Sequence, residues 1–159
     1  MEKGIPKVMN KYMQMAIEEA RKGVDAGHGG PFGAVIVKDG VVIGKGHNDV
    51  IHLQDPTCHG EIMAIHEACK NLGTFDLSGS EIYTTGEPCP MCLGAILWAN
   101  IGKIYYGCSI EDTEKIGFRD SAFYEVSGQG RGELMHELDR SACLELYDHY
   151  ASIKDKKHY

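Results

Sequence analysis

Residues 59–61 read His-Gly-Glu and residues 88–92 read Pro-Cys-Pro-Met-Cys, and these two segments decide the fold and chemistry expected of the chain. His59, Cys89 and Cys92 supply three zinc ligands and leave the fourth tetrahedral position open, as in a catalytic rather than a structural zinc site. Glu61 adds a spare carboxylate. Zinc lowers the pKa of a bound water toward about 7, and a nearby carboxylate can take and return its proton. The sequence therefore predicts a catalytic zinc centre with Glu61 as the proton shuttle.

The order of the two motifs carries further information. H-x-E followed by P-C-x-x-C is the signature of zinc-dependent nucleobase deaminases. The alternative is a chance Cys-x-x-Cys pair with an unrelated histidine upstream. Because both motifs are present in the right order, the signature is favoured.

Composition and charge favour a compact enzyme. A chain of 159 residues with 43% hydrophobic content predicts one domain over residues 1–159, and the two motifs make it a zinc-dependent deaminase domain. The 16 basic and 23 acidic residues give a net charge of −7, so phosphate backbones are not attracted and nucleic acid is not an expected partner. No apolar run approaches the roughly 20 residues of a membrane span, and the N-terminus lacks the apolar core of a signal peptide. We expect a cytoplasmic protein with no membrane contact.

Helical and strand patterns alternate along the chain. In chain order they are a helix at 12–24, strands at 32–38 and 41–45, a helix from His59, a strand at 81–85, a helix at 89–99, strands at 101–107 and 134–138, and a helix at 143–153. Asp39-Gly40 between the first two strands indicates a hairpin. The alternation predicts a layered α/β sheet with helices on both faces. The glycine-rich stretch 127–132 is predicted to be a mobile loop.

Both metal-binding segments lie at the start of a predicted helix. A helix start offers unpaired N–H groups and a partial positive charge, which favour ionised cysteine and an oxyanion forming over the zinc. The helix from His59 is predicted to bury one apolar side, formed by Ile62, Ile65, Cys69 and Leu72.

The remaining cysteines and histidines are predicted to be structural. Disulfides are disfavoured in a reducing compartment, so the four cysteines outside the motif are expected to pack as small apolar residues: Cys58, Cys69, Cys108 and Cys143. Four histidines are expected to be surface or hydrogen-bonded polar residues: His28, His47, His52 and His66.

Through these motifs the chain resembles the cytidine deaminase superfamily over nearly its whole length, in the branch that holds guanine deaminase, fungal cytosine deaminase and tRNA adenosine deaminase. The resemblance implies a three-layer α/β/α fold with a five-stranded mixed sheet. It also implies that His59, Cys89 and Cys92 bind Zn²⁺ and that Glu61 moves protons.

Short matches to bacterial guanine deaminase concern the substrate. Gly-Gly-Pro-Phe at 29–32 resembles the strand whose phenylalanine packs on the base, which implies that role for Phe32. Asn48 matches the superfamily asparagine that hydrogen-bonds the base. Gly-Phe-Arg-Asp-Ser at 117–121 resembles a segment whose aspartate contacts guanine, here Asp120. The C-terminal end of the chain, at Tyr159, resembles the end of guanine deaminases, whose final tyrosine enters an active site. In the bacterial enzyme this is the active site of the partner subunit, because the C-terminal segment is exchanged.

Each of these four residues has a plainer alternative role. Phe32 would fit an ordinary core and Asn48 a turn. Asp120 would fit a helix cap, and Tyr159 a frayed end. Glu87, beside the second motif, would fit either substrate contact or a solvent-facing position.

Some residues depart from the guanine deaminase pattern. Gly60, where guanine deaminases commonly have alanine, and Gly46-His47-Asn48 read more like fungal cytosine deaminase. Thr85-Gly86-Glu87 lacks the cysteine often found there in guanine deaminases. One feature argues against cytosine deaminase. The C-terminal helix lacks the tryptophan that closes the pocket of the fungal enzyme, since the sole tryptophan of this chain is Trp98.

The function predicted from the sequence is zinc-dependent hydrolysis of guanine to xanthine and ammonia by a homodimer, with a C-terminal segment of about 133–159 exchanged between subunits. Cytosine or nucleoside deamination is the first alternative. A tRNA adenosine deaminase is the second, although it should carry a basic surface. A zinc-stabilised binding module without chemistry is the third, and it would be expected to lack Glu61.

Overall fold

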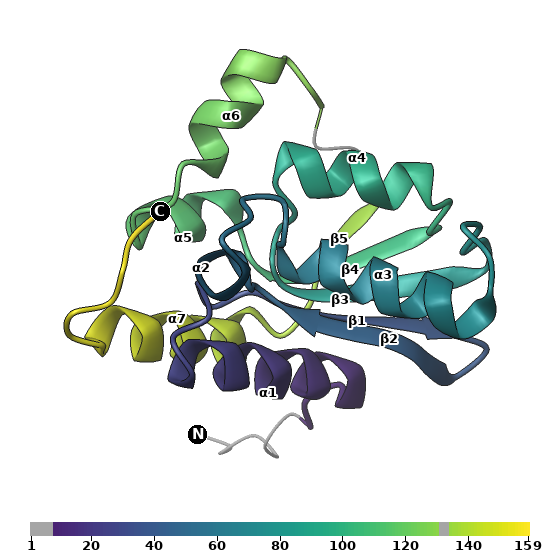
Figure 1. Ribbon diagram of the computed structural model, residues 1–159, viewed down its shortest axis with the longest axis horizontal. Coiled ribbons are helices and arrows are strands. Elements are labelled where there is room, and N and C mark those ends of the chain that lie inside the picture. The colour runs from purple at the N-terminus through teal and green to yellow at the C-terminus, as the bar shows by residue number, and fades with distance from the viewer. Residues whose placement is uncertain (1–7, 131–133) are drawn as a thin grey trace, which may run out of the picture.

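A five-stranded mixed sheet forms the centre of the computed structural model, which describes residues 8–130 and 134–159 (Figure 1). The strand order is β2-β1-β3-β4-β5. The strands are β1 (Gly33–Lys38), β2 (Val41–His47), β3 (Ser80–Gly86), β4 (Lys103–Cys108) and β5 (Met135–Glu137). β1 pairs antiparallel with β2 and β3, whereas β4 pairs parallel with β3 and β5. The predicted hairpin is confirmed, because Asp39 and Gly40 both have positive φ, as a tight two-residue turn requires.

Helices cover both faces of the sheet, which confirms the predicted three-layer fold. α1 (Lys11–Asp25) and α7 (Arg140–Ser152) lie on one face, and α3 (Gly60–Leu72) and α4 (Pro90–Trp98) lie on the other (Figure 1). Alternate residues of each strand point to opposite faces, so the sheet supports two cores. Ala34 and Ile36 pack with α3 and α4, while Val35 and Val37 pack with α1 and α7.

Helix α3 lies closer to the sheet than its apolar pattern predicted. Its buried residues are small or polar: Gly60, Glu61, Ala64 and Ala68. A Cβ atom at Gly44 of β2 would come within 2.5 Å of the Ala64 carbonyl oxygen. The predicted buried side was therefore wrong in part, since Leu72 is 40% exposed, while Ile65 and Cys69 are partly buried at the edge of the contact. Because α3 lies so close to the sheet, the Glu61 side chain is buried.

Three short helices were not predicted: α2 (Val50–Leu53), α5 (Ile110–Lys115) and α6 (Asp120–Ser127). They lack the long apolar periodicity on which the sequence analysis relied. A capping box between Ser109 and Asp112 defines the start of α5. Asp112 also accepts two hydrogen bonds of 2.8 Å from Arg140, which tie α5 to α7.

The C-terminal part of the chain packs on its own subunit in this structure. α7 contacts β4 and α1, and the tail beyond it reaches back to the turn after α1. Of the predicted loop 127–132, residues 131 and 132 lie outside the described residues, and Gly128 ends α6 with a positive φ. Exchange of the segment between subunits stays a prediction.

All six cysteines are free, and Cys58, Cys108 and Cys143 are buried, as expected for packing residues. Within the described residues, none of the helices is both long enough and apolar enough to cross a membrane.

We predict that the contact of Asp112 with Arg140 stabilises the fold. Asp112→Asn should lower the free energy of unfolding by about 1–2 kcal/mol. This value is smaller than that of a fully buried charged pair, because the Arg140 side chain is half-exposed and solvent screens the interaction. Asp25→Asn, which removes only the exposed partner of His149 at 2.7 Å, is the matched control and should have a much smaller effect in urea unfolding. Equal effects of the two variants would contradict the prediction.

The pH dependence of this stabilisation follows from the same contact. Hydrogen bonds from Arg140 lower the pKa of Asp112 from 3.8 to about 2. The stabilisation is therefore present above about pH 4 and is lost as the pH falls toward 2, so wild type and Asp112→Asn should converge in stability over that range.

Candidate active site

Two helix N-termini bring the predicted metal ligands together. His59 immediately precedes α3 and Cys89 immediately precedes α4, while Cys92 lies in the first turn of α4. The Sγ atoms of Cys89 and Cys92 each lie 3.6 Å from Nδ1 of His59. Pro90 occupies the first turn of α4, where a missing N–H does not interrupt the helix.

The spacing of these three atoms fits a zinc ion. Zn–S bonds of about 2.3 Å and Zn–N bonds of about 2.0–2.1 Å at a tetrahedral angle place sulfur and nitrogen about 3.6 Å apart. The three donor atoms all lie within 4.8 Å of one another, and both cysteines are buried. Two thiolates and one imidazole are the soft and borderline ligands that zinc prefers.

The local electrostatics favour a thiolate at Cys89. The Cys92 thiol and His59 hydrogen-bond its sulfur and lower the pKa of Cys89 to about 4, although burial opposes this change. Burial raises the pKa of the Cys92 thiol instead. One ligand is therefore charged before any metal binds, and the second would lose its proton on coordination.

Glu61 is the second residue of α3 and lies beside the ligands, with only 6% of its surface exposed. Burial disfavours its charged form and, together with the nearby Cys89 thiolate, raises its pKa to about 7. A carboxyl group with a pKa close to neutrality can both accept and release a proton during a reaction.

A small cavity of about 30 Å³ adjoins Glu61 and the ligands. The structure brings the predicted substrate residues to its wall: Phe32, Asn48, Asp120 and Tyr159. This volume holds about one or two water molecules. A base would therefore enter only if the residues that cover the cavity shift.

Asn48 presents an unpaired donor. It is 1% exposed, its Oδ1 accepts a hydrogen bond from the backbone N–H of Val50 at 3.2 Å, and its backbone N–H donates to Phe32 O at 2.9 Å. Its Nδ2 has no hydrogen-bond partner among the described residues. Buried polar atoms without a partner are rare, and this one lines the cavity, so it is placed to bind a ligand.

Tyr159 closes the cavity in its own chain. Its hydroxyl accepts a hydrogen bond of 2.8 Å from the backbone N–H of Gly30, and its ring lies 5.4 Å from that of Phe118. A Cβ atom at position 30 would come within 2.9 Å of this hydroxyl, so a larger residue there would displace the docked ring. The tail is docked in this structure and is not frayed.

Asp120 faces the cavity from the start of α6. Burial raises its pKa to about 6, and the Cys89 thiolate acts in the same direction. The carboxyl is thus mostly ionised at neutral pH and can accept a hydrogen bond.

Two wall residues were missed or left open in the sequence analysis. Phe118 is 6% exposed and contacts Phe32 edge-to-face at 4.9 Å, and its signal was its place two residues before Asp120. Glu87 is 4% exposed and accepts a hydrogen bond from the Ile110 N–H at 3.2 Å. The solvent-facing alternative for Glu87 was therefore wrong.

Comparison with known proteins shows which family has this architecture. The zinc-binding region of cytidine and deoxycytidylate deaminases matches residues 6–108. The chain belongs to this deaminase family. It is a hydrolytic deaminase, and its five-stranded fold is that of the family.

Relatives and solved structures extend the likeness over the whole chain. A guanine deaminase from Bacillus subtilis is 40% identical over 151 residues, which cover 93% of this chain and 97% of that protein. A solved structure of guanine deaminase from Bacillus subtilis gives a TM-score of 0.72 over 95% of this chain and 99% of that chain. A tRNA-specific adenosine deaminase from Bacillus subtilis is 44% identical over 142 residues, 89% of this chain and 76% of that protein. The structure of NE0047 in complex with 2,6-diaminopurine is 28% identical with a TM-score of 0.79, over 93% of this chain and 84% of that chain.

We predict that Cys89→Ala loses the tightly held zinc of the purified deaminase, because two ligands cannot hold the ion as three do. Cys69→Ala, which removes a thiol outside the cluster, should keep it. Elemental analysis after dialysis against zinc-free buffer measures both. Retention of the tightly held zinc by Cys89→Ala would show that the ligand assignment is wrong.

Proposed function

We propose that this deaminase hydrolyses guanine to xanthine and ammonia, with His59, Cys89 and Cys92 holding zinc and Glu61 transferring protons. The observation that carries the proposal is the unpaired Nδ2 donor of Asn48 in the wall of a cavity that also contains the buried Glu61. The guanine deaminase relative supports this substrate, as does the binding of 2,6-diaminopurine and 8-azaguanine by structural neighbours.

The groups around the cavity fit a free purine base. Guanine offers both a carbonyl acceptor and ring N–H donors. Asn48 Nδ2 can donate to an acceptor, and the ionised Asp120 can accept from a ring N–H. Phe32 lines the cavity and is held edge-on by Phe118 and Tyr147, so its ring can pack on the base.

The charge of the chain argues against a tRNA substrate. Its net charge of −7 gives a tRNA no electrostatic attraction. The docked tail does not distinguish a base from a larger substrate, because the closed cavity of about 30 Å³ admits neither. The charge favours a free base over tRNA, even though tRNA adenosine deaminases are relatives.

Zinc in this site would lower the pKa of a bound water and so supply a nucleophile at neutral pH. Glu61 accepts a proton from the attacking water and delivers it to the ring nitrogen next to C2, which makes C2 electrophilic. Water oxygen bonds to C2 and the C2–N bond to the amino group then breaks. Glu61 takes the proton of the new C2 hydroxyl group and gives it to the departing amino group, so ammonia leaves and a carbonyl remains.

The test of the proposal is ammonia release from guanine, cytosine, adenine, guanosine and cytidine. We expect guanine to be the preferred substrate. Glu61→Gln should retain zinc and fold but lose turnover at or beyond the upper end of the usual 10²–10⁴-fold range of acid–base contributions, because one carboxyl serves several transfers. Preference for another substrate would overturn the guanine assignment. Near-wild-type ammonia release by Glu61→Gln would remove Glu61 from the mechanism.

We also predict that the C-terminal tail covers the active site. In the predicted homodimer, the exchanged tail would close the partner's cavity in the way that Tyr159 closes the cavity of its own chain here. Deleting residues 156–159 should leave fold and zinc intact, while substrate affinity and turnover fall together because the pocket stays open to water. Tyr159→Phe keeps the ring and loses only the hydrogen bond from Gly30, so it should be affected less. Full activity of the truncated chain would show that Tyr159 is not part of the site.

Mixed dimers distinguish exchange from closure within one chain. A Glu61→Gln chain has a tail, and a tail-deleted chain has Glu61. Mixing the two should restore part of the activity if the tail acts across the dimer. If the mixture stays inactive, the tail acts within its own subunit and the exchange is wrong.

A further inference from the structure

A second group of metal-binding side chains lies outside the cavity. Among the described residues, His28, His47 and Asp49 also place one donor atom each within 4.8 Å of the others. His28 follows α1, His47 ends β2, and Asp49 comes two residues later. We call these three residues the histidine cluster. None of them lines the cavity beside Glu61.

We propose that the histidine cluster is a second metal site, which binds a divalent transition-metal ion through Nδ1 of His28, Nε2 of His47 and Oδ1 of Asp49. The three donor atoms are separated by 3.0, 3.3 and 4.0 Å. Bonds of about 2.0–2.2 Å at a tetrahedral angle separate ligand atoms by about 3.3–3.6 Å, so small shifts suffice. Two imidazoles and one carboxylate suit zinc and its neighbours in the first transition row.

Glu19 prepares His47 for this role. Glu19 Oε1 lies 2.9 Å from Nδ1 of His47, and this hydrogen bond lowers the pKa of Glu19, which therefore stays ionised. An ionised carboxylate only accepts, so Nδ1 of His47 carries a proton, and Nε2 faces Nδ1 of His28 and Oδ1 of Asp49. A metal ion would replace the 3.0 Å hydrogen bond between the two histidines, and the proton that their facing nitrogens share would be displaced. A carboxylate on the outer nitrogen of a ligating histidine is a regular feature of protein metal sites.

Neighbouring contacts hold the other two ligands. His52 Nδ1 lies 2.9 Å from Oδ1 of Asp49, and its ring stacks on that of His28 with centroids 4.1 Å apart. The backbone N–H groups of Ile51 and His52 both donate to the carbonyl oxygen of His28, at 3.0 and 3.2 Å. The two segments that supply the ligands are thus fixed to each other before any ion binds.

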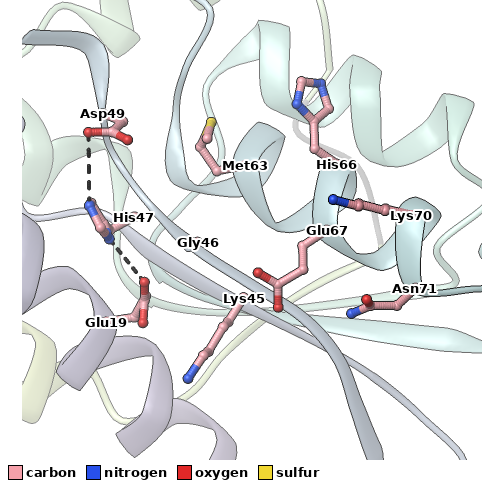
Figure 2. Close-up of a pocket in the computed structure, with 10 residues that line it drawn as sticks. All are labelled: Glu19, Lys45, Gly46, His47, Asp49, Met63, His66, Glu67, Lys70 and Asn71. Carbon is pink, nitrogen blue, oxygen red and sulfur yellow. Dashed lines mark hydrogen bonds and ion pairs between the residues drawn. The ribbon is translucent and has the colours of Figure 1, made fainter. Parts of the chain in front are cut away.

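The cluster has access to solvent through an adjoining groove. Figure 2 shows His47 between Glu19 and Asp49 on the wall of this groove, which has a volume of about 520 Å³. The side chains of His47 and Asp49 are 19% and 14% exposed, which suits partly desolvated ligands that an ion can still reach. His66 lies on the same groove but outside the cluster.

The position of the cluster gives the ion a structural role. His47 and Asp49 are the chain neighbours of Asn48, which presents its unpaired Nδ2 to the cavity. An ion that bridges the two flanking residues would hold the segment that carries Asn48. Because the ion binds the folded arrangement of ligands, it should also raise the melting temperature.

The experiment uses the whole 159-residue chain with zinc in the His59, Cys89 and Cys92 site and free metal removed. Titration with Co²⁺ should show one further equivalent bound, with d–d absorption but without the thiolate charge-transfer band that a cysteine site gives. Co²⁺ and Zn²⁺ should both raise the melting temperature. No second equivalent, or no response in melting temperature, would show that the cluster is only a hydrogen-bonded network.

Variants locate the ion. His28→Gln should lose the second equivalent and the thermal response while it keeps the tightly held zinc, and His66→Ala, the matched control in the same groove, should keep both. Glu19→Gln retains all three ligands and should bind Co²⁺ about 10–100-fold more weakly. A second equivalent that persists in His28→Gln would overturn the assignment.

A further variant separates this proposal from the proposed function. Cys89→Ala should still take up one Co²⁺ without a thiolate band, whatever its activity. Loss of that uptake would count against an independent second site, whereas the substrate panel has no bearing on it.

Discussion

Helix α3 lies on β2 with only glycine and alanine between the two backbones. Gly44 and Gly46 face Ala64, Ala68 and the start of α3, where a Cβ atom on either glycine would come within 2.5–2.6 Å of α3 atoms. This close approach holds His59 and Glu61 against the end of the sheet, within reach of Cys89 and Cys92 on α4. The glycine contacts therefore place the three candidate metal ligands and Glu61 in one small volume.

The same packing removes water from groups that would otherwise be solvated. Glu61 is buried beside a thiolate, and Asn48 keeps an unpaired amide donor, and both arrangements oppose folding. A metal ion and a bound base would supply the missing partners. Such costs are commonly concentrated at functional sites, where raised pKa values and unpaired donors are useful for catalysis.

Two parts of the chain that are distant in sequence complete the cavity. Phe118 lies between α5 and α6, Asp120 is the first residue of α6, and Tyr159 is the last residue of the chain. Phe118 contacts both Phe32 and Tyr159, so it links the tail to the residue that immediately precedes β1. These residues from distant parts of the chain cover the cavity beside Glu61.

The sequence by itself determined the hairpin and the α/β class, and it predicted that His59, Cys89 and Cys92 lie together near Glu61, because these features depend on residue type and short spacing at the ends of helices and strands. It did not determine the buried side of α3, the helices at 110–127 or the buried position of Glu87, since these depend on how closely distant elements approach. The histidine cluster is the clearest case. His28 and His47 are 19 positions apart and were predicted to be ordinary polar residues, yet the return of β2 beside α1 places their ring nitrogens 3.0 Å apart. Only the tertiary structure decides such a contact, because it requires chain segments far apart in sequence to be fixed against each other.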